Sequence, residues 1–200
     1  MKRNDFIKNS ALFAFSLSAC GSVINSKNEV FETDCETTND ILGPFYRPNS
    51  PKRNNLLFKG IDGSKIKIKG KVFSSCKAIL NNAQIEIWHC NTTGEYDNES
   101  EQFLHRGQTL STTDGDYEFT TIFPGKYKNG KLYRPAHIHF RVTHPSCKEL
   151  ISQIYFQGDP HITEDPWASN QKAEKRILPF IPEDINGNLS IQFDIFLAKT

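Results

Sequence analysis

Two histidines, His137 and His139, are separated by one residue in a run of strand-forming residues. Successive side chains of a strand point to opposite faces, so both imidazoles would lie on one face, with their Cα atoms about 7 Å apart. That spacing suits two ligands of a single metal ion, and Arg141 would follow on the same face. An ordinary strand with one polar face explains the pattern equally well. A metal site therefore requires further ligands elsewhere in the chain.

Two tyrosines in predicted loops could supply those ligands. Tyr96 follows a Thr-Gly-Glu turn, and Tyr127 lies between the turn-forming pairs Pro124-Gly125 and Asn129-Gly130. Either tyrosine alone would be expected to pack against its neighbours. Their order along the chain, together with the histidine strand, nevertheless belongs to a wider pattern.

Six short segments make up this pattern. They are Gly43-Pro44-Phe45-Tyr46, Ile87-Trp88-His89 with Gly94 and Tyr96, Asp114-Gly115 with Tyr117, Pro124-Gly125 with Tyr127, Arg134 to Phe140, and Gln153 to Pro160. Through them the chain resembles the intradiol ring-cleavage dioxygenases over about residues 39 to 197. These are non-haem iron(III) enzymes typified by protocatechuate 3,4-dioxygenase and catechol 1,2-dioxygenase.

The resemblance implies a metal centre made of Tyr96, Tyr127, His137 and His139, with one iron(III) ion per chain. Iron(III) is a hard, highly charged ion that prefers anionic oxygen, and coordination can deprotonate a phenol. Two phenolates and a bound hydroxide would balance its charge. The family's exchangeable ligand corresponds to Tyr127, which would leave when the diol binds and would act as a base. The other ligands would stay in place.

The resemblance also implies the reaction, in which a catechol-type aromatic diol is cleaved with O2 to a cis,cis-muconate-type diacid. The family's arginine and glutamine beside the metal correspond to Arg134 and Gln153, which would bind substrate and assist catalysis. Arg134 would stabilise negative charge that develops near the ring. Leu42 and Pro44 would line the mouth of the pocket, and Leu42 stands where the family commonly has glutamate. The sequence does not identify the diol.

Two other functions compete with this one. A non-catalytic β-sandwich envelope lipoprotein could use the same tyrosines and histidines for packing, or to bind a ligand or metal. The presence of every expected ligand together with Arg134 and Gln153 favours the enzyme. A zinc hydrolase is less consistent, because phenolate is an unusual zinc ligand and no carboxylate accompanies the histidine pair.

Composition and patterning indicate an all-β, single-domain β-sandwich with long loops that carry the metal site. The 200-residue chain has 24 basic and 23 acidic side chains, a balance that argues against a nucleic-acid partner. Short alternating segments bounded by turn residues predict strands. They lie at about residues 65–73, 83–89, 109–113, 117–121, 136–143, 150–156 and 190–197. Asp114-Gly115 predicts a hairpin between the third and fourth strands. A homo-oligomer is compatible with this pattern, but the sequence leaves the oligomeric state open.

The N-terminus has the anatomy of an export signal. Residues 1–20 combine early basic residues with a short apolar run ending in Leu17-Ser18-Ala19-Cys20, which resembles a bacterial lipobox. Residues 21–38 are polar and predict a tether, so the dioxygenase-like domain would span 39–200. Cys20 would carry the lipid and hold an exported protein on the bacterial cell envelope, on its periplasmic or outer face. The sequence leaves open the export route and the choice of inner or outer membrane.

Four further cysteines remain after Cys20. Cys35, Cys76, Cys90 and Cys147 show no C-x-x-C spacing, which argues against a zinc–thiolate site. In an oxidising compartment we expect them to be at least partly oxidised, with three alternative connectivities for two disulfides.

The predicted lipid anchor is testable by metabolic labelling. The wild-type protein should incorporate labelled palmitate and fractionate with membranes, because its hydrophilic chain alone has little membrane affinity. Cys20→Ser should incorporate no label and should appear in the soluble fraction. Soluble behaviour of both proteins would contradict the prediction.

Overall fold

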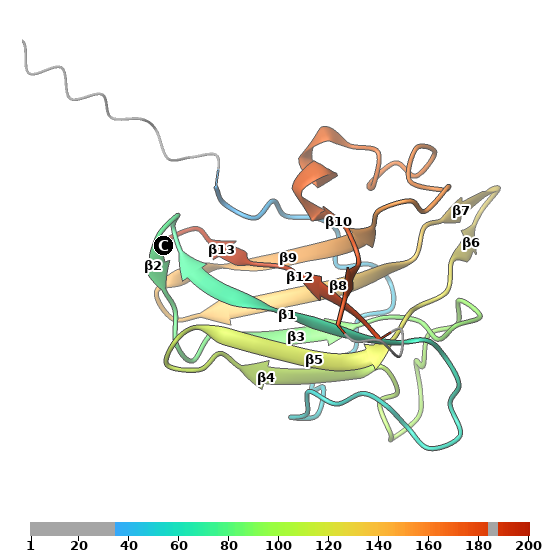
Figure 1. Cartoon of the computed structure of the whole chain (residues 1–200), viewed down its shortest axis with the longest axis horizontal. Helices are drawn as coiled ribbons and strands as arrows, with labels where there is room; N and C mark the ends of the chain where they lie inside the picture. The colour runs from blue at the N-terminus through green and yellow to red at the C-terminus, as the bar shows by residue number, and fades with distance from the viewer. Residues whose placement is uncertain (1–34, 184–187) are drawn as a thin grey trace, which may run out of the picture. The chain divides into compact units, whose positions relative to one another are not determined.

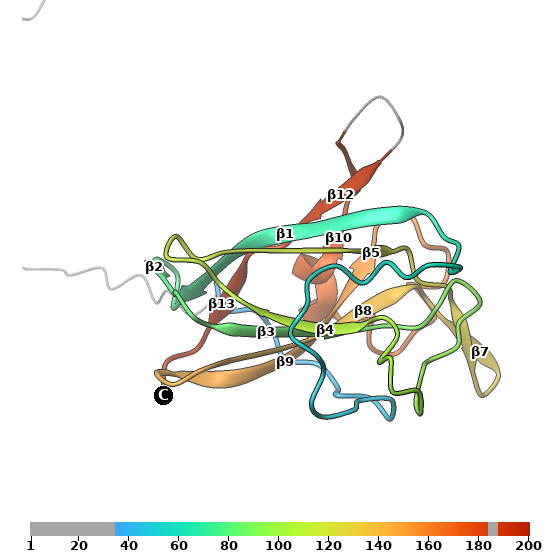
Figure 2. The same cartoon turned by 90° about the horizontal axis from the view of Figure 1, so that it is seen from below.

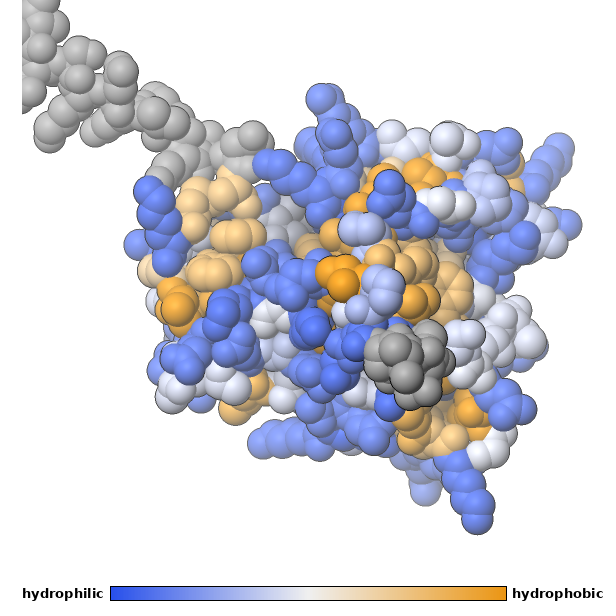
Figure 3. Space-filling view, in the orientation of Figure 1, coloured by the Kyte–Doolittle hydropathy of each residue, from blue (hydrophilic) through white to orange (hydrophobic). Residues whose placement is uncertain are grey.

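A computed structural model of the chain describes residues 35–183 and 188–200. The predicted signal peptide with Cys20, and the predicted tether up to residue 34, lie outside the described residues. No helix in the described part of the chain is long and apolar enough to cross a membrane. Figure 3 shows one face of the protein, on which hydrophilic side chains surround smaller apolar groups.

Two sheets pack into the predicted β-sandwich (Figures 1 and 2). The six-stranded sheet comprises β1 (Lys65–Ser74), β2 (Ala78–Ile79), β5 (Asp116–Ile122), β11 (Ile181–Pro182), β12 (Leu189–Gln192) and β13 (Ile195–Leu197). The five-stranded sheet comprises, in spatial order, β10 (Ile177–Leu178), β9 (Cys147–Phe156), β8 (His137–His144), β3 (Gln84–Trp88) and β4 (Arg106–Leu110). A separate hairpin joins β6 (Tyr127–Asn129) to β7 (Leu132–Arg134), and the 3₁₀ helix η1 spans Gln171–Arg176.

Alternation along the strands separates an apolar core from a polar sheet face. Ile138 and Phe140 of β8, with Ile87 of β3, are fully buried in the core. His137 and His139, which alternate with these residues along β8, point to the other face of the five-stranded sheet and are also buried. That outer face must therefore be covered. Figure 2 shows the N-terminal part of the described chain running below this sheet, on the side away from β1 and β5.

The turn at Asp114-Gly115 does not make the predicted hairpin. Gly115 N–H donates to Thr112 O at 3.0 Å, so the chain does reverse. However, β4 pairs with β3 in one sheet whereas β5 pairs with β1 in the other. The buried hydroxyl of Ser111 just before the turn donates to Leu80 O at 2.7 Å. The segment thus crosses between the two sheets, and the expectation of a hairpin was wrong.

Two other local expectations differ from the structure. Tyr127 begins a strand of the β6–β7 hairpin instead of lying in an open loop. The strand predicted over residues 190–197 is split into β12 and β13. At the break the Asp194 carboxylate accepts the Lys71 N–H at 3.0 Å, so a side chain replaces a backbone partner. Phe193 O also occupies the position that a Cβ on Gly70 would need, which favours glycine there.

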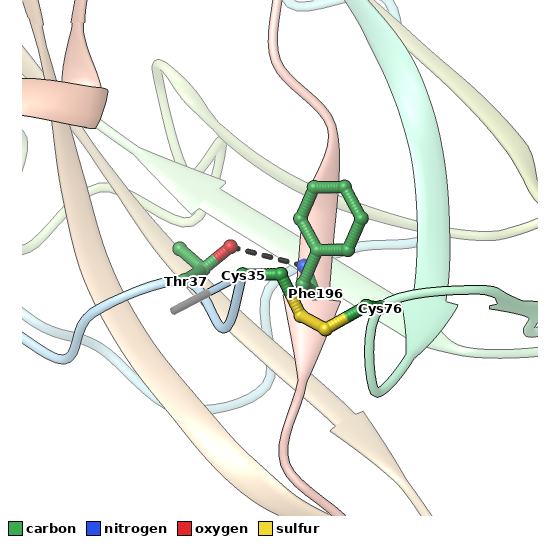
Figure 4. The surroundings of a disulfide bond; sticks show 4 residues. All are labelled: Cys35, Thr37, Cys76 and Phe196. Carbon is green, nitrogen blue, oxygen red and sulfur yellow. Dashed lines mark hydrogen bonds between the residues drawn. A yellow bond between two sulfur atoms is a disulfide. The ribbon is translucent and has the colours of Figure 1, made fainter. Parts of the chain in front are cut away.

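Residues 35–43 form an extended segment, here called the strap. Cys35 is joined to Cys76 by a disulfide (Figure 4). Next to it, Thr37 N–H donates to Phe196 O and the Thr37 hydroxyl accepts the Phe196 N–H, both at 3.0 Å. Residues 35–38 of the predicted tether are therefore attached to the sandwich.

The cysteine prediction is confirmed for one pair. Cys35–Cys76 is oxidised, whereas Cys90 and Cys147 are free and buried. Cys90 Sγ lies 3.1 Å from Gly125 O, which it can reach as a donor. Burial raises the pKa of the Cys90 thiol to about 12, so this thiol is unreactive.

Removal of the disulfide should destabilise the domain. Because the bond closes a loop with a sequence separation of 41, Cys35→Ser/Cys76→Ser should lower the free energy of unfolding by about 3–4 kcal/mol. Reduction of the denatured wild-type protein should expose one additional pair of thiols. An unchanged unfolding free energy, or the appearance of two pairs, would contradict the assignment.

Candidate active site and metal centre

Four side chains lie in one row across the outer face of the five-stranded sheet. In register, Arg106 of β4 is opposite Trp88 of β3, and Trp88 is opposite His139 of β8. His139 is in turn opposite Gln153 of β9. The Trp88 and His139 rings are stacked, with centroids 4.8 Å apart and planes at 8°. Strand pairing thus fixes the position of the His139 imidazole and places Gln153 beside it.

Both histidines are arranged as neutral imidazoles. His137 and His139 are each 1% exposed, and their ring centroids lie 5.0 Å apart. His137 Nδ1 is 2.7 Å from Pro135 O, so it carries the proton and leaves the Nε2 lone pair available to a metal. Burial lowers the pKa of His137 to about 3, which keeps the ring neutral. His139 Nδ1 has no hydrogen-bond partner within the described part of the chain.

Tyr96 and Tyr127 approach the histidines from separate segments. The Tyr96 hydroxyl lies 3.3 Å from His137 Nε2, and the Tyr127 ring centroid lies 5.5 Å from that of His137. The two phenol rings meet edge to face at 5.8 Å. Their segments are in close contact because Gly94, with φ of +90°, packs against Lys126 O. A side chain at Gly94 would collide there, so this glycine permits the close approach of the two segments that carry the tyrosines.

The donor set suits a highly charged ion that binds phenolate oxygen. Burial raises the pKa of Tyr96 well above its usual value and also raises that of Tyr127, so both phenols are protonated without a cation. Across the described residues, no group of three or more His, Cys, Asp or Glu side chains could hold a metal. The two histidines and two tyrosines predicted as ligands are instead brought together. Their chemistry fits iron(III).

Arg134 is buried next to this donor set. It is directly opposite Tyr127 in the β6–β7 hairpin, and its charge opposes the effect of burial on the pKa of Tyr127. Arg134 Nε donates to Asp165 at 2.8 Å, and its guanidinium lies 4.4 Å from the Trp167 ring centroid. Arg134 Nη2 donates to Gln153 Oε1 at 3.1 Å. The structure thus places the predicted arginine and glutamine together.

The strap forms one edge of the site. Gly43 has φ of +75°, and a Cβ there would lie 3.0 Å from His139 Cε1, so a glycine allows this close approach. The flanking Leu42 is half-buried and Pro44 is exposed, as expected for residues at a rim. Phe45 stacks on Tyr96 with ring centroids 4.3 Å apart.

Sequence reasoning missed the acidic partners of this site. Asp165 comes from the loop after β9 and Asp40 from the strap, and neither belongs to a periodic pattern. Arg176, which pairs with Asp40 at 2.7 Å, comes from η1. Only the folded arrangement brings these segments together. Tyr155, by contrast, was part of a matching segment, although its role was not predicted.

Comparison with known proteins identifies the family. The dioxygenase family profile matches residues 41–198. Catechol 1,2-dioxygenase of Candida albicans is 30% identical over 184 residues, which cover 81% of this chain and 61% of that protein. Chlorocatechol 1,2-dioxygenase of Rhodococcus opacus is 32% identical over 175 residues, which cover 76% of this chain and 67% of that protein. The chain thus spans less than two thirds of the Candida relative.

A solved structure agrees with these relatives. The dioxygenase domain of a dioxygenase–carbohydrate-binding fusion from Streptomyces sp. SirexAA-E superposes with a TM-score of 0.72 at 27% identity. The match covers 82% of this chain and 99% of that chain. The protein belongs to the intradiol ring-cleavage dioxygenase family, a family of enzymes.

The buried histidines make stability depend on pH. Burial lowers the pKa of His89, like that of His137, to about 3, whereas the unfolded chain titrates near 6.5. As pH falls below about 6.5 the unfolded chain binds protons that the folded chain excludes, so unfolding is favoured progressively. Each histidine should lower the free energy of unfolding of the metal-free protein by up to about 1.4 kcal/mol per pH unit.

Urea unfolding of the metal-free protein between about pH 5 and pH 7 measures this slope. His89→Gln should reduce the slope, because one buried group no longer titrates. An unfolding free energy that is independent of pH would contradict the neutral histidines.

Proposed function

We propose that this chain is a non-haem iron(III) intradiol dioxygenase that cleaves a catechol-type diol with O2. The observation that supports the proposal most strongly is the convergence of Tyr96, Tyr127, His137 and His139 from three separate segments in one buried place. Two imidazole nitrogens and two phenol oxygens gathered at one place are a donor set that suits a highly charged metal ion. Tyr96, His137 and His139 would hold the ion throughout.

Bound iron(III) supplies Lewis acidity toward the diol oxygens and the redox chemistry that lets the diol react with O2. The protein's contribution is to hold the ion, to orient the diol and to accept protons from it. Tyr127 would be the exchangeable ligand and base, the role that the family resemblance gives it, and it is a half-buried residue at the start of the short β6 strand. As it takes a proton from the diol, its phenolate becomes a neutral phenol.

Arg134 is suited to stabilise negative charge near the reacting ring. Its guanidinium is fixed by Asp165 and Gln153 and lies on the same face of the hairpin as Tyr127. A cation held in place before the reaction needs no rearrangement as charge develops, and such groups commonly contribute several kcal/mol to rate enhancement. Gln153 would fix the arginine, and Leu42 and Pro44 would form the rim through which the diol enters.

The proposed substrate class is based on the names of the similar proteins. Their names specify catechol and chlorocatechol, so we propose a small catechol-type diol as substrate and a cis,cis-muconate-type diacid as product. We also propose the location that the N-terminal sequence indicates, an exported protein anchored to the cell envelope through lipid on Cys20.

Variants of the two tyrosines test the assigned roles. Tyr127→Phe should still bind iron and keep some visible colour through Tyr96, but its oxygen uptake with catechol should fall at least about a hundredfold for want of the base. Tyr96→Phe should retain iron weakly and lose its colour in the diol complex. His137→Ala and His139→Ala should resemble Tyr96→Phe, because neither imidazole is exchanged.

The measurements are iron content, the visible spectrum with and without catechol, and oxygen uptake for each protein. Tyr133→Phe is a matched control, since Tyr133 is an exposed tyrosine of the same hairpin. It should behave as wild type. Full activity of Tyr127→Phe would refute the mechanism, and undiminished iron in both histidine variants would refute the site.

A further inference from the structure

The strap carries a buried carboxylate immediately before the region that matches the dioxygenase family, which begins at residue 41. The side chain of Asp40 is 4% exposed. Its Oδ2 accepts a hydrogen bond from Arg176 Nη1 at 2.7 Å and lies 3.3 Å from the Tyr155 hydroxyl. Its Oδ1 accepts the Ile41 N–H at 2.7 Å and Gln153 Nε2 at 3.2 Å. The carboxylate therefore has partners on both oxygens and is fixed in position.

Asp40 helps to determine which way the Gln153 amide faces. The oxygen and nitrogen of an amide have nearly the same size, so only their partners decide the orientation. Gln153 Nε2 donates to Asp40 Oδ1 and, at 3.3 Å, to Ile41 O. A reversed amide would set its oxygen against these two acceptors. Its NH2 group would also face the donors of Arg134, so both ends would be unfavourable.

The amide orientation in turn fixes Arg134. Gln153 Oε1 accepts from Arg134 Nη2 at 3.1 Å, while Asp165 holds Arg134 Nε at 2.8 Å. Two points of attachment on a planar guanidinium define its plane as well as its position. Without the Gln153 oxygen, Arg134 would lose one of the two strongest attachments that define its plane and would keep the ion pair with Asp165 and a weaker contact with the Tyr155 hydroxyl at 3.3 Å.

We propose that Asp40 is a positioning residue for diol cleavage. Its carboxylate sets the orientation of the Gln153 amide, and the amide sets the Arg134 guanidinium beside the reacting diol. This inference rests on the proposed function. It assigns a positioning role in the reaction to Asp40, in the part of the strap that precedes the rim residue Leu42.

Variants that exchange the carboxylate of Asp40 and the amide of Gln153 test the proposal. In Asp40→Asn the Gln153 amide meets another amide and loses its fixed orientation, and in Gln153→Glu two carboxylates face each other. The double variant Asp40→Asn/Gln153→Glu keeps the net charge and restores a donor opposite an acceptor between residues 40 and 153, while the contacts of both residues with the Ile41 backbone are lost. With catechol as substrate, each single variant should lose about tenfold in kcat. The double variant should lose clearly less than the two single variants combined, because one donor–acceptor pair is restored.

Thr38→Val is the matched control. Thr38 also lies in the strap, and its hydroxyl binds Lys172 O and Arg176 Nε without contacting Gln153. Its kcat should stay within about twofold of wild type even if stability falls. Additive losses in the double variant, or a loss in Thr38→Val equal to that in Asp40→Asn, would overturn the proposal and leave Asp40 as a purely structural partner of Arg176.

A second readout needs no turnover. In the 15N-labelled, metal-free protein, hydrogen exchange of the Gln153 side-chain NH2 should be at least about tenfold faster in Asp40→Asn than in wild type or Thr38→Val. An unchanged exchange rate would overturn the role of Asp40. Absence of oxygen uptake by the wild-type protein with any diol would instead refute the proposed function, so the two failures are distinguishable.

Discussion

Burial of Arg134 and Arg176 near the outer face of the five-stranded sheet is the constraint on which the rest of the site depends. Arg134 and Arg176 are 3% and 2% exposed, and a buried charge without a partner costs several kcal/mol. Each is therefore paired with an aspartate, Asp165 for the first and Asp40 for the second. These partners come from the loop after β9 and from the strap. Satisfying the two charges thus brings distant segments over the sheet, where the two histidines are buried.

Burial also sets the protonation states of the candidate metal ligands. Burial keeps the imidazole of His137 neutral and the phenols of Tyr96 and Tyr127 protonated. A cation that binds must therefore displace phenol protons, and an ion of high charge compensates best for that loss. The arrangement favours a trivalent ion over the divalent ions that carboxylate or thiolate sites hold.

Short alternating segments bounded by turns were sufficient to predict the sandwich, and the spacing of His137 and His139 predicted that both imidazoles lie on one face of a strand. Their role as metal ligands with Tyr96 and Tyr127 came from the family resemblance. Local patterns failed where a tertiary contact decided the outcome. The turn signal at Asp114-Gly115 fits a hairpin and a crossover equally well, and only the packing of two sheets separates them. Asp40 and Asp165 could not be predicted, because a single acidic residue in a segment without periodicity carries no information about its distant partner.

Tyrosinate formation on metal binding directly tests whether Tyr96 and Tyr127 bind a trivalent ion as phenolates. Gallium(III) has the charge of iron(III) but no visible colour, so ultraviolet difference spectra of the metal-free protein titrated with it report phenolate alone. At neutral pH we expect tyrosinate absorption from both Tyr96 and Tyr127, reduced by about half in Tyr96→Phe and in Tyr127→Phe and unchanged in Tyr133→Phe. Saturation with gallium(III) without a tyrosinate signal, or equal signals in all variants, would contradict it.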